Sequence, residues 1–542
     1  MQSFNLLTRR GFLDRSFKVG LGVALSTLVD IPFVMKRALA EGNIGLNGKK
    51  LLFIFLRGAN DALNSVIPVQ DSAYNATNRP NILIPKDGLT DYSVAGGCDF
   101  PTDPFFMYAK AIRLGNGFAA LHPSLKYLAP VYNAGELALI HRVGYPKQSR
   151  SHFDSQNYWE NGNPNNNISK DGIFYRTMIE SGLAGTAPLT GVSIQSALPL
   201  LLRGQAAAMT NLTDPTRYDL LGIPNTTAGG KKADSALLSA NTYPFPDKLN
   251  REFLSLQYAN LANTLQIFAG IDFNENATAG NPAKPGNYFR DDSPAKDGTG
   301  YYLFPTTNAK NGDFANGNDN TKYVVDSSSN AYSLFTNLKA AALILNNTDA
   351  IIAGTEFSGF DTHNAQGSVT GTHANLQRRI AWAMYALRKY FLRYSNKATW
   401  DNLIVITLSE FGRTTIQNQS LGTDHAEAGL MFVAGGAVKG YNNGHPTGVF
   451  GCSPNDSIPW VTGPANQAGG VDGSMFGVSD RYLKRIVDYR SVLGEIIRKH
   501  LGATQNQLNH IIPGYAISGE QLLSGGTSSI DGAPIIGEVG IL

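Results

Sequence analysis

The sequence predicts a three-layer α/β/α fold with a mostly parallel central sheet, and two observations lead to this prediction. First, Lys50–Arg57 is a continuous apolar run that ends at Gly58, which is the pattern of a parallel strand buried on both faces. Second, further strand-like segments alternate along the chain with segments of helical period. In this class of fold, helices pack on both faces of one sheet.

The other elements are predicted from length and periodicity. Leu376–Tyr394 has the spacing of an amphipathic helix, and Arg490–Leu501 is predicted to form a C-terminal helix. Residues 160–330 are rich in Asn, Gly, Pro and Asp and have few periodic runs, so we interpret residues 41–542 as one domain with a loop-rich insertion or cap at about 160–330. Four more strands are expected at Leu137–Val143, Ala350–Thr355, Leu403–Leu408 and Leu430–Ala434.

The first 40 residues have the features of a twin-arginine (Tat) signal peptide. Arg9-Arg10 is followed by the weakly hydrophobic stretch Val19–Val29 and then by Ala38-Leu39-Ala40, a small-x-small cleavage pattern. The apolar stretch is about half of the roughly 20 residues that a helix needs to cross a bilayer. We therefore expect export through the Tat translocase to the periplasm or beyond, without a stable transmembrane anchor.

Charge and cysteine content exclude some classes of function. Residues 1–40 hold six basic and two acidic residues, so the remaining 39 basic and 40 acidic residues give a formal charge of −1. A near-neutral chain without a basic stripe gives no reason to expect nucleic-acid binding. The two cysteines, Cys98 and Cys452, could form a disulfide or could both be small buried residues, and the sequence leaves this open.

Polar residues gather where the predicted strands end, which is the edge at which open α/β sheets bind ligands. Carboxylates and imidazoles at such an edge can hold zinc, manganese or a related divalent cation. A serine at a helix N-terminus benefits from the helix dipole, and so does a tetrahedral anion bound there. The strand-end residues with this chemistry are Asp61, Arg150, Ser151, His152, Asp361, His363, Glu410, Arg413, Asp424 and His425.

Several motifs in order resemble the domain-of-unknown-function 1501 family, whose members are Tat-exported and related to the alkaline phosphatase and sulfatase superfamily. The motifs are LLFIFLRGANDALNSVIP, RSHFDSQNYWENG, FDTH, ITLSEFGRT and GTDHAEAGLMFVAGGAVKG, within residues 48–505. The resemblance implies an alkaline phosphatase-like fold. It implies metal ligands at Asp61, Asp361, His363 and Glu410, with Asp424 or His425 completing the set, and Ser151 at the nucleophile position. Phe411 stands where the superfamily carries a metal-binding histidine, so one ion or two remain open.

Two functions follow from these residues. In the first, a metal-dependent hydrolase cleaves a small phosphate or sulfate ester: Ser151 attacks in line while Arg150 or Arg413 holds the anionic oxygens, and His152 is the candidate base. Each residue also has a structural alternative, because Ser151 and Asp61 could simply cap helices and the arginines could pair with carboxylates. In the second, the protein is non-catalytic and works with another exported protein.

Overall fold

The structure is a computed structural model, and it covers most of the chain. The N-terminal segment predicted to be a Tat signal lies outside the described residues, and so does Cys98, whereas Cys452 is buried. Within the described part of the chain, no helix is both long enough and apolar enough to cross a bilayer. The described residues are 44–92, 108–115, 117–184, 189–205, 207, 209–214, 264, 267–268, 270–271, 273, 303–305, 329–453, 456–462, 474–477, 481–517 and 520–542.

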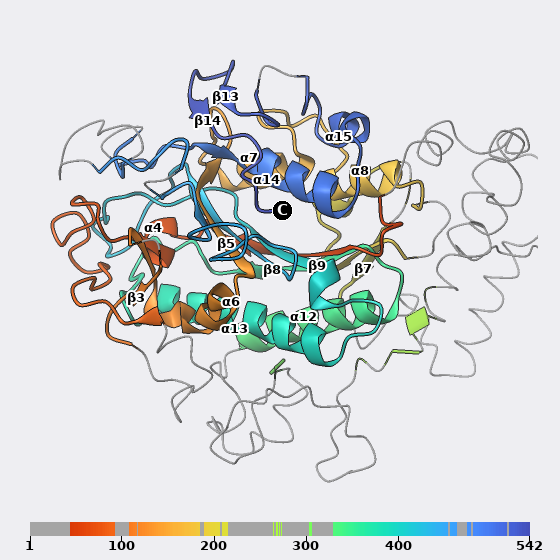
Figure 1. The fold of residues 1–542 in the computed structure, drawn as a ribbon, viewed down its shortest axis with the longest axis horizontal. Coiled ribbons are helices and arrows are strands. Elements are labelled where there is room, and N and C mark those ends of the chain that lie inside the picture. The colour runs from red at the N-terminus through yellow and green to blue at the C-terminus, as the bar shows by residue number, and fades with distance from the viewer. Residues whose placement is uncertain are drawn as a thin grey trace, which may run out of the picture.

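A nine-stranded, mostly parallel sheet forms the centre of the fold (Figure 1), with the strand order β11-β5-β10-β9-β1-β8-β6-β7 and with β12 paired to β5. Only β10 runs antiparallel to its neighbours. The bounds are β1 Lys50–Arg57, β5 Leu137–Gly144, β6 Gly191–Ile194, β7 Thr210–Leu212, β8 Ile352–Ser358, β9 Leu403–Leu408, β10 Gly429–Ala434, β11 Val449–Phe450 and β12 Val487–Asp488.

Helices cover both faces of this sheet, as Figure 1 shows. Alternate residues of β1 enter two separate apolar cores: Leu52 and Ile54 pack in one, Leu51 and Phe53 in the other. This alternation follows from the two-residue repeat of a strand. The first core includes η2 (Pro123–Leu128), α6 (Ala129–Asn133), α12 (Ser329–Asn347) and α13 (Thr372–Arg393). The second includes α7 (His152–Asn161), α8 (Ile173–Glu180), α14 (Tyr489–Glu495), the π-helical turn η5 (Ile496–His500) and α15 (Gln505–Ile511).

Shorter elements complete the described fold. Two small antiparallel sheets lie beside the central one, in the strand orders β2-β4-β3 and β13-β14. The bounds are α4 Ala62–Ser65, β2 Val66–Pro68, β3 Ile112–Arg113, β4 Ala119–Leu121, η3 Leu200–Leu202, η4 Trp400–Asn402, β13 Gly526–Thr527 and β14 Pro534–Ile535.

The prediction of a mixed α/β fold around a large, mostly parallel sheet is confirmed. All five predicted strands are present, with shifts of up to three residues at their ends. Within the segment 160–330, β6 and β7 continue the central sheet beyond β8, and α8 packs in the second core. These strands have four and three residues, which is too short for a hydrophobic period to be recognised.

The direction of the strands determines which residues meet. The strands β1, β8 and β9 are parallel, and β5 has the same direction because β10 is antiparallel to both β5 and β9. The carboxyl ends of these four strands therefore lie at one edge. The chain that leaves β9 stays at this edge until β10 begins there, so residues 409–428 belong to the same edge.

Candidate metal centre

Close backbone packing brings the chain after β1 against the chain after β8. Gly58 has φ +110°, and a Cβ atom there would lie 2.4 Å from the backbone nitrogen of Asp361. Only glycine permits both this conformation and this approach. Gly58 also donates its N–H to Glu410 Oε1 at 2.8 Å, so the ends of β1, β8 and β9 meet at one point.

His152 is the first residue of α7, and Ser151 is the N-cap of this helix. The Nδ1 atom of His152 lies 2.8 Å from Glu410 Oε1, which also accepts a hydrogen bond from Gln156 Nε2 at 2.9 Å. Because a carboxylate oxygen accepts, Nδ1 carries the proton and Nε2 keeps its lone pair. That Nε2 is buried, has no hydrogen-bond partner in the described structure, and lies 3.4 Å from Asp361 Oδ2.

His425 and His363 are held in the same way. His425 Nδ1 donates to the carbonyl oxygen of Arg150 at 2.8 Å, and His363 Nδ1 donates to Asp424 Oδ1 at 3.1 Å. Their Nε2 atoms are then both acceptors, yet they lie 2.8 Å from each other. Asp361 Oδ1 lies 3.1 Å from the Nε2 atom of His363 and 3.2 Å from that of His425. Lone pairs this close repel one another unless a proton or a cation lies between them.

Burial and nearby charges shift the pKa values of His152, His425 and Asp361 in different directions. The hydrogen bond that His152 donates to Glu410 raises the pKa of His152, against the opposing effect of burial. Burial lowers the pKa of His425, and the charge of His152 adds to this effect. Burial alone would raise the pKa of Asp361, but the guanidinium of Arg413, together with His363 and His152, lowers it. Asp361 is therefore ionised at neutral pH and lies among three imidazoles.

Arg413 lies beneath this group with its side chain fully buried. Its Nη1 donates to Asp361 Oδ1 at 2.8 Å, and its Nε donates to Thr423 Oγ1 at 3.3 Å. Its Nη2 is buried and has no hydrogen-bond partner in the described part of the chain, and the same holds for Glu410 Oε2. Together with His152 Nε2, three buried polar atoms without partners belong to residues of one site, a common sign of a missing ligand, ion or water.

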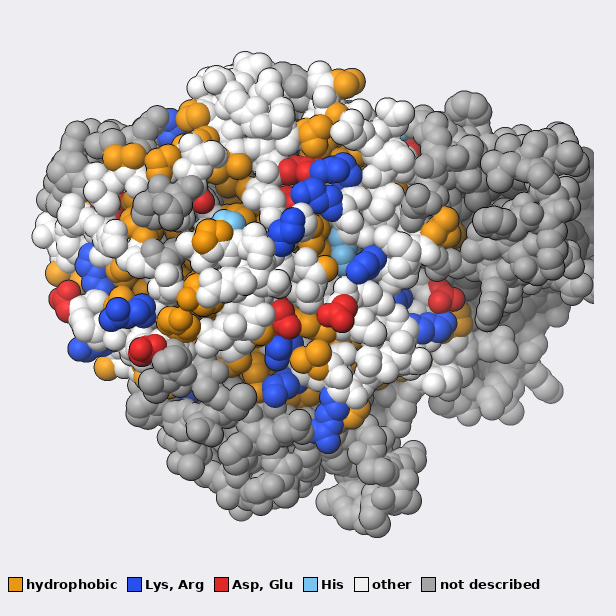
Figure 2. Space-filling model, in the orientation of Figure 1, with side chains coloured by type: hydrophobic (Ala, Val, Ile, Leu, Met, Phe, Trp, Pro, Cys, Tyr) orange, Lys and Arg blue, Asp and Glu red, His pale blue; other side chains and the backbone are white. Residues whose placement is uncertain are grey.

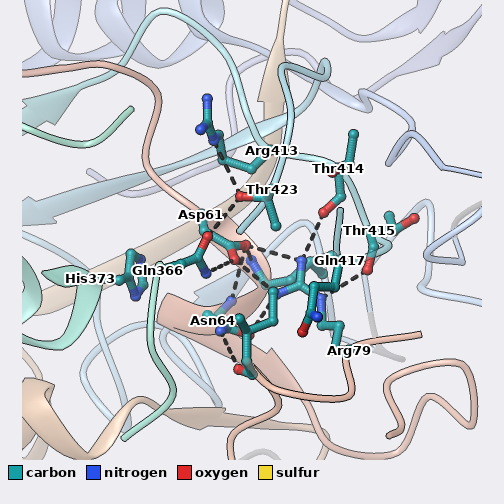
Figure 3. Close-up of polar contacts among 12 residues, drawn as sticks. Asp61, Asn64, Arg79, Gln366, His373, Arg413, Thr414, Thr415, Gln417 and Thr423 are labelled. Atoms are coloured by element: carbon teal, nitrogen blue, oxygen red, sulfur yellow. Dashed lines mark hydrogen bonds and ion pairs between the residues drawn. The ribbon is translucent and has the colours of Figure 1, made fainter. Parts of the chain in front are cut away.

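The structure places Asp61 apart from this group, in the buried network that Figure 3 shows. Its carboxylate caps α4 by accepting from the N–H of Leu63, forms an ion pair with Arg79 at 2.8 Å, and accepts from Gln366 Nε2 at 2.7 Å. Burial alone would raise the pKa of Asp61, but Arg79 lowers it to about 2. The positive charge opposite Asp61 is thus supplied by the protein itself.

The remaining predicted residues take distinct places. His152, Asp361 and His425 each offer one ligand atom within 4.8 Å of the others, and His363 contacts two of the three. Glu410 and Asp424 orient histidines through Nδ1. Ser151 Oγ accepts from the N–H of Asp154 at 3.5 Å, and the neighbouring Arg150 carbonyl orients His425.

Phe411 and several supporting residues have roles that the sequence did not indicate. The ring of Phe411 packs on His152 and His425, with centroids 4.9 Å from each. Gln156 could have been found from its spacing, because it follows His152 by one helical turn. Arg79 and Gln366 lie in loops without any periodic signal, so their contacts with Asp61 depend entirely on the tertiary fold.

Comparison with known proteins adds one relationship. Residues 310–447 match the family described as "Protein of unknown function (DUF1501)", and this range contains Asp361, His363, Glu410, Arg413 and His425. No curated protein and no solved structure matches the chain.

Proposed function

We propose that this chain, which belongs to the DUF1501 family through residues 310–447, is a Tat-exported, metal-dependent hydrolase of phosphate or sulfate esters with an alkaline phosphatase-like α/β/α fold. One observation carries the proposal. Three histidines have Nδ1 bonded to oxygen acceptors while their Nε2 atoms surround the carboxylate of Asp361. This is the arrangement by which proteins prepare imidazoles to bind a metal.

The donor set suits one divalent cation of the zinc or manganese class. His152, His363 and His425 would bind through Nε2, and Asp361 would bind through its carboxylate. Among the described residues, those near this group offer no ligands for a second ion, because Asp61 is paired with Arg79 and the apolar ring of Phe411 packs against two of the imidazoles. When bound, such a cation supplies Lewis acidity to an anionic ester group.

The protein side chains would then bind and orient the ester. The free N–H groups of Arg413 Nη2 are available to an anionic oxygen, and a guanidinium in a buried site binds such an oxygen strongly. Ser151 supplies a hydroxyl at the N-terminus of α7, between two residues that both contact the histidine group. Its half-exposed position leaves it open to a substrate, and we assign it as the nucleophile.

Metal content tests the first part of the proposal. Full-length protein, purified without chelator, should contain about one zinc or manganese per chain, and His363→Ala and His425→Ala should each lose it. His510→Asn is the matched control, because His510 is a partly exposed histidine in α15, outside the group. A wild-type protein that binds neither ion after exposure to both would refute the metal centre.

Hydrolysis of p-nitrophenyl phosphate and p-nitrophenyl sulfate tests the second part. Ser151→Ala should abolish turnover while the metal content stays unchanged, and Ser169→Ala serves as a control in a nearby loop. Full activity of a folded, metal-loaded Ser151→Ala protein would exclude Ser151 as the nucleophile.

A second candidate function is a non-catalytic metal-binding protein that works with another exported protein. Its support is that Phe153, next to His152, is 89% exposed and Ile168 is 83% exposed. Exposed apolar side chains that gather into one contiguous patch mark sites of protein contact. A wild-type protein with one bound metal and no turnover of either ester would favour this function over hydrolysis.

A further inference from the structure

We infer that Arg150, Arg481 and Tyr482 form an anion-binding subsite beside the proposed metal centre, which recognises a second anionic group on the substrate. This inference rests on the proposed function. The inference extends the proposed function by naming the substrate class: esters with a further negative charge some distance from the group that is cleaved.

The two arginines flank the ring of Tyr482. The guanidinium carbon of Arg150 lies 4.6 Å from the centroid of this ring, and that of Arg481 lies 5.9 Å from it. An aromatic face holds a guanidinium by cation–π attraction and leaves its N–H groups free at the edges to bind an anion. The ring of Tyr482 thus contacts both guanidinium groups.

Both arginines are joined directly to the metal centre. The carbonyl of Arg150 orients His425, and Nη2 of Arg481 forms an ion pair at 3.1 Å with Asp424, which orients His363. The carbonyl of Arg481 also accepts a hydrogen bond from the N–H of Thr415 at 3.0 Å. This bond holds the segment around Arg481 against the chain that follows β9. A ligand at the metal centre would therefore have the two guanidinium groups at its side.

The guanidinium group of Arg150 is more available to bind an anion than that of Arg481. Its side chain is exposed, and it forms no ion pair with any carboxylate among the residues that the structure describes. Glu427 interacts with it electrostatically but does not form an ion pair with it. Arg481 uses one of its five N–H groups in its hydrogen bond to Asp424, so the other four lie outside that bond. The subsite therefore has positive charge and free donors, which suit a carboxylate, sulfate or phosphate group.

Binding of paired ligands tests this inference without any need for turnover. The ligands are ω-carboxyalkyl phosphonates of graded chain length and the matching ω-carboxamides, titrated calorimetrically into the metal-loaded full-length protein. At the best chain length, the carboxylate should bind about fivefold more tightly than the amide, and this difference should shrink at high ionic strength.

Variants identify the groups responsible. The preference for the carboxylate, which is the ratio of the carboxylate and amide affinities measured on the same protein, should fall toward one in Arg150→Gln and in Arg481→Gln. Arg203→Gln, at an exposed arginine outside this region, should leave both affinities unchanged. Equal affinity for carboxylate and amide at every chain length would overturn the subsite while leaving the metal centre intact. Failure of both ligands to bind would overturn the anion-binding metal centre itself, and the subsite with it.

Discussion

Glu410→Gln tests how the proposed metal centre is supported, because it leaves the proposed ligands themselves unchanged. Glu410 Oε1 accepts from the N–H of Gly58, from Nδ1 of His152 and from Nε2 of Gln156, at 2.8–2.9 Å. Glutamine has nearly the same shape and keeps one oxygen, but its carbonyl is neutral. The substitution therefore removes the charge that keeps His152 oriented, and it leaves every proposed ligand atom in place.

The expected effect on metal affinity can be bounded. Partners that orient metal-bound histidines contribute about 10–100-fold to metal affinity, which is about 1.4–2.7 kcal/mol. We expect the upper part of this range, because Glu410 is fully buried and its bond to His152 is charge-assisted. The amide nitrogen would also take the place of Oε2, which has no partner in the described structure, and would add an unpaired buried donor.

Competition between the protein and a zinc chelator measures this change. Glu356→Gln is the matched control, because Glu356 is a partly exposed carboxylate paired with Arg57 and has no contact with the histidine group. Unfolding in urea must show that Glu410→Gln remains folded. Unchanged zinc affinity in a folded Glu410→Gln protein would refute the claim that Glu410 orients His152 for metal binding.

Three further predictions concern the framework of the site. Arg79→Met should lower the free energy of unfolding by about 3–5 kcal/mol, because it leaves the Asp61 carboxylate buried without its cation; a smaller loss in urea unfolding would contradict this. Burial lowers the pKa of His500 to about 4, so its contribution is complete above the unfolded value of about 6.5 and decreases as the pH falls toward 4, by up to about 3 kcal/mol. His500→Gln, which keeps the donor to Lys50 O, should flatten that pH dependence of stability, and an unchanged slope would count against it. Gly58→Ala should cost about 2 kcal/mol or more and weaken metal binding, because its Cβ would displace Asp361; wild-type thermal stability and zinc affinity would disprove this.

The parts of the fold that follow from local patterns were predictable. Lys50–Arg57 and Leu403–Leu408 form strands with the predicted bounds, because long apolar runs bounded by turn residues have few other solutions. Parallel strands also bring their carboxyl ends to one edge, so the meeting of Asp361, His152 and His425 could be expected from the order of elements alone.

The placement of Asp61 could not be predicted in this way. An aspartate after a strand has the same sequence pattern whether it caps a helix or binds a metal, and Asp61 caps α4. The deciding partner is Arg79, which lies 18 residues further along in a loop without periodic pattern. For the same reason, the antiparallel direction of β10 was not apparent: it depends on the course of residues 409–428 along the sheet edge, which the composition of these residues does not reveal.

On the face in Figure 2, basic and acidic side chains are interspersed. Two of the carboxylates at this edge, Asp61 and Asp361, have different surroundings. Asp61 is neutralised within the fold by Arg79, so its environment is complete without any ligand. Asp361 is ionised, only partly compensated by Arg413, and surrounded by imidazole nitrogens whose lone pairs face it. Because these nitrogen lone pairs and carboxylate oxygens lie close together, a bound cation should raise the melting temperature through its contacts with Asp361 and the histidines. Asp361→Asn should therefore abolish stabilisation by zinc, whereas Asp61→Asn should lower stability equally with and without the metal.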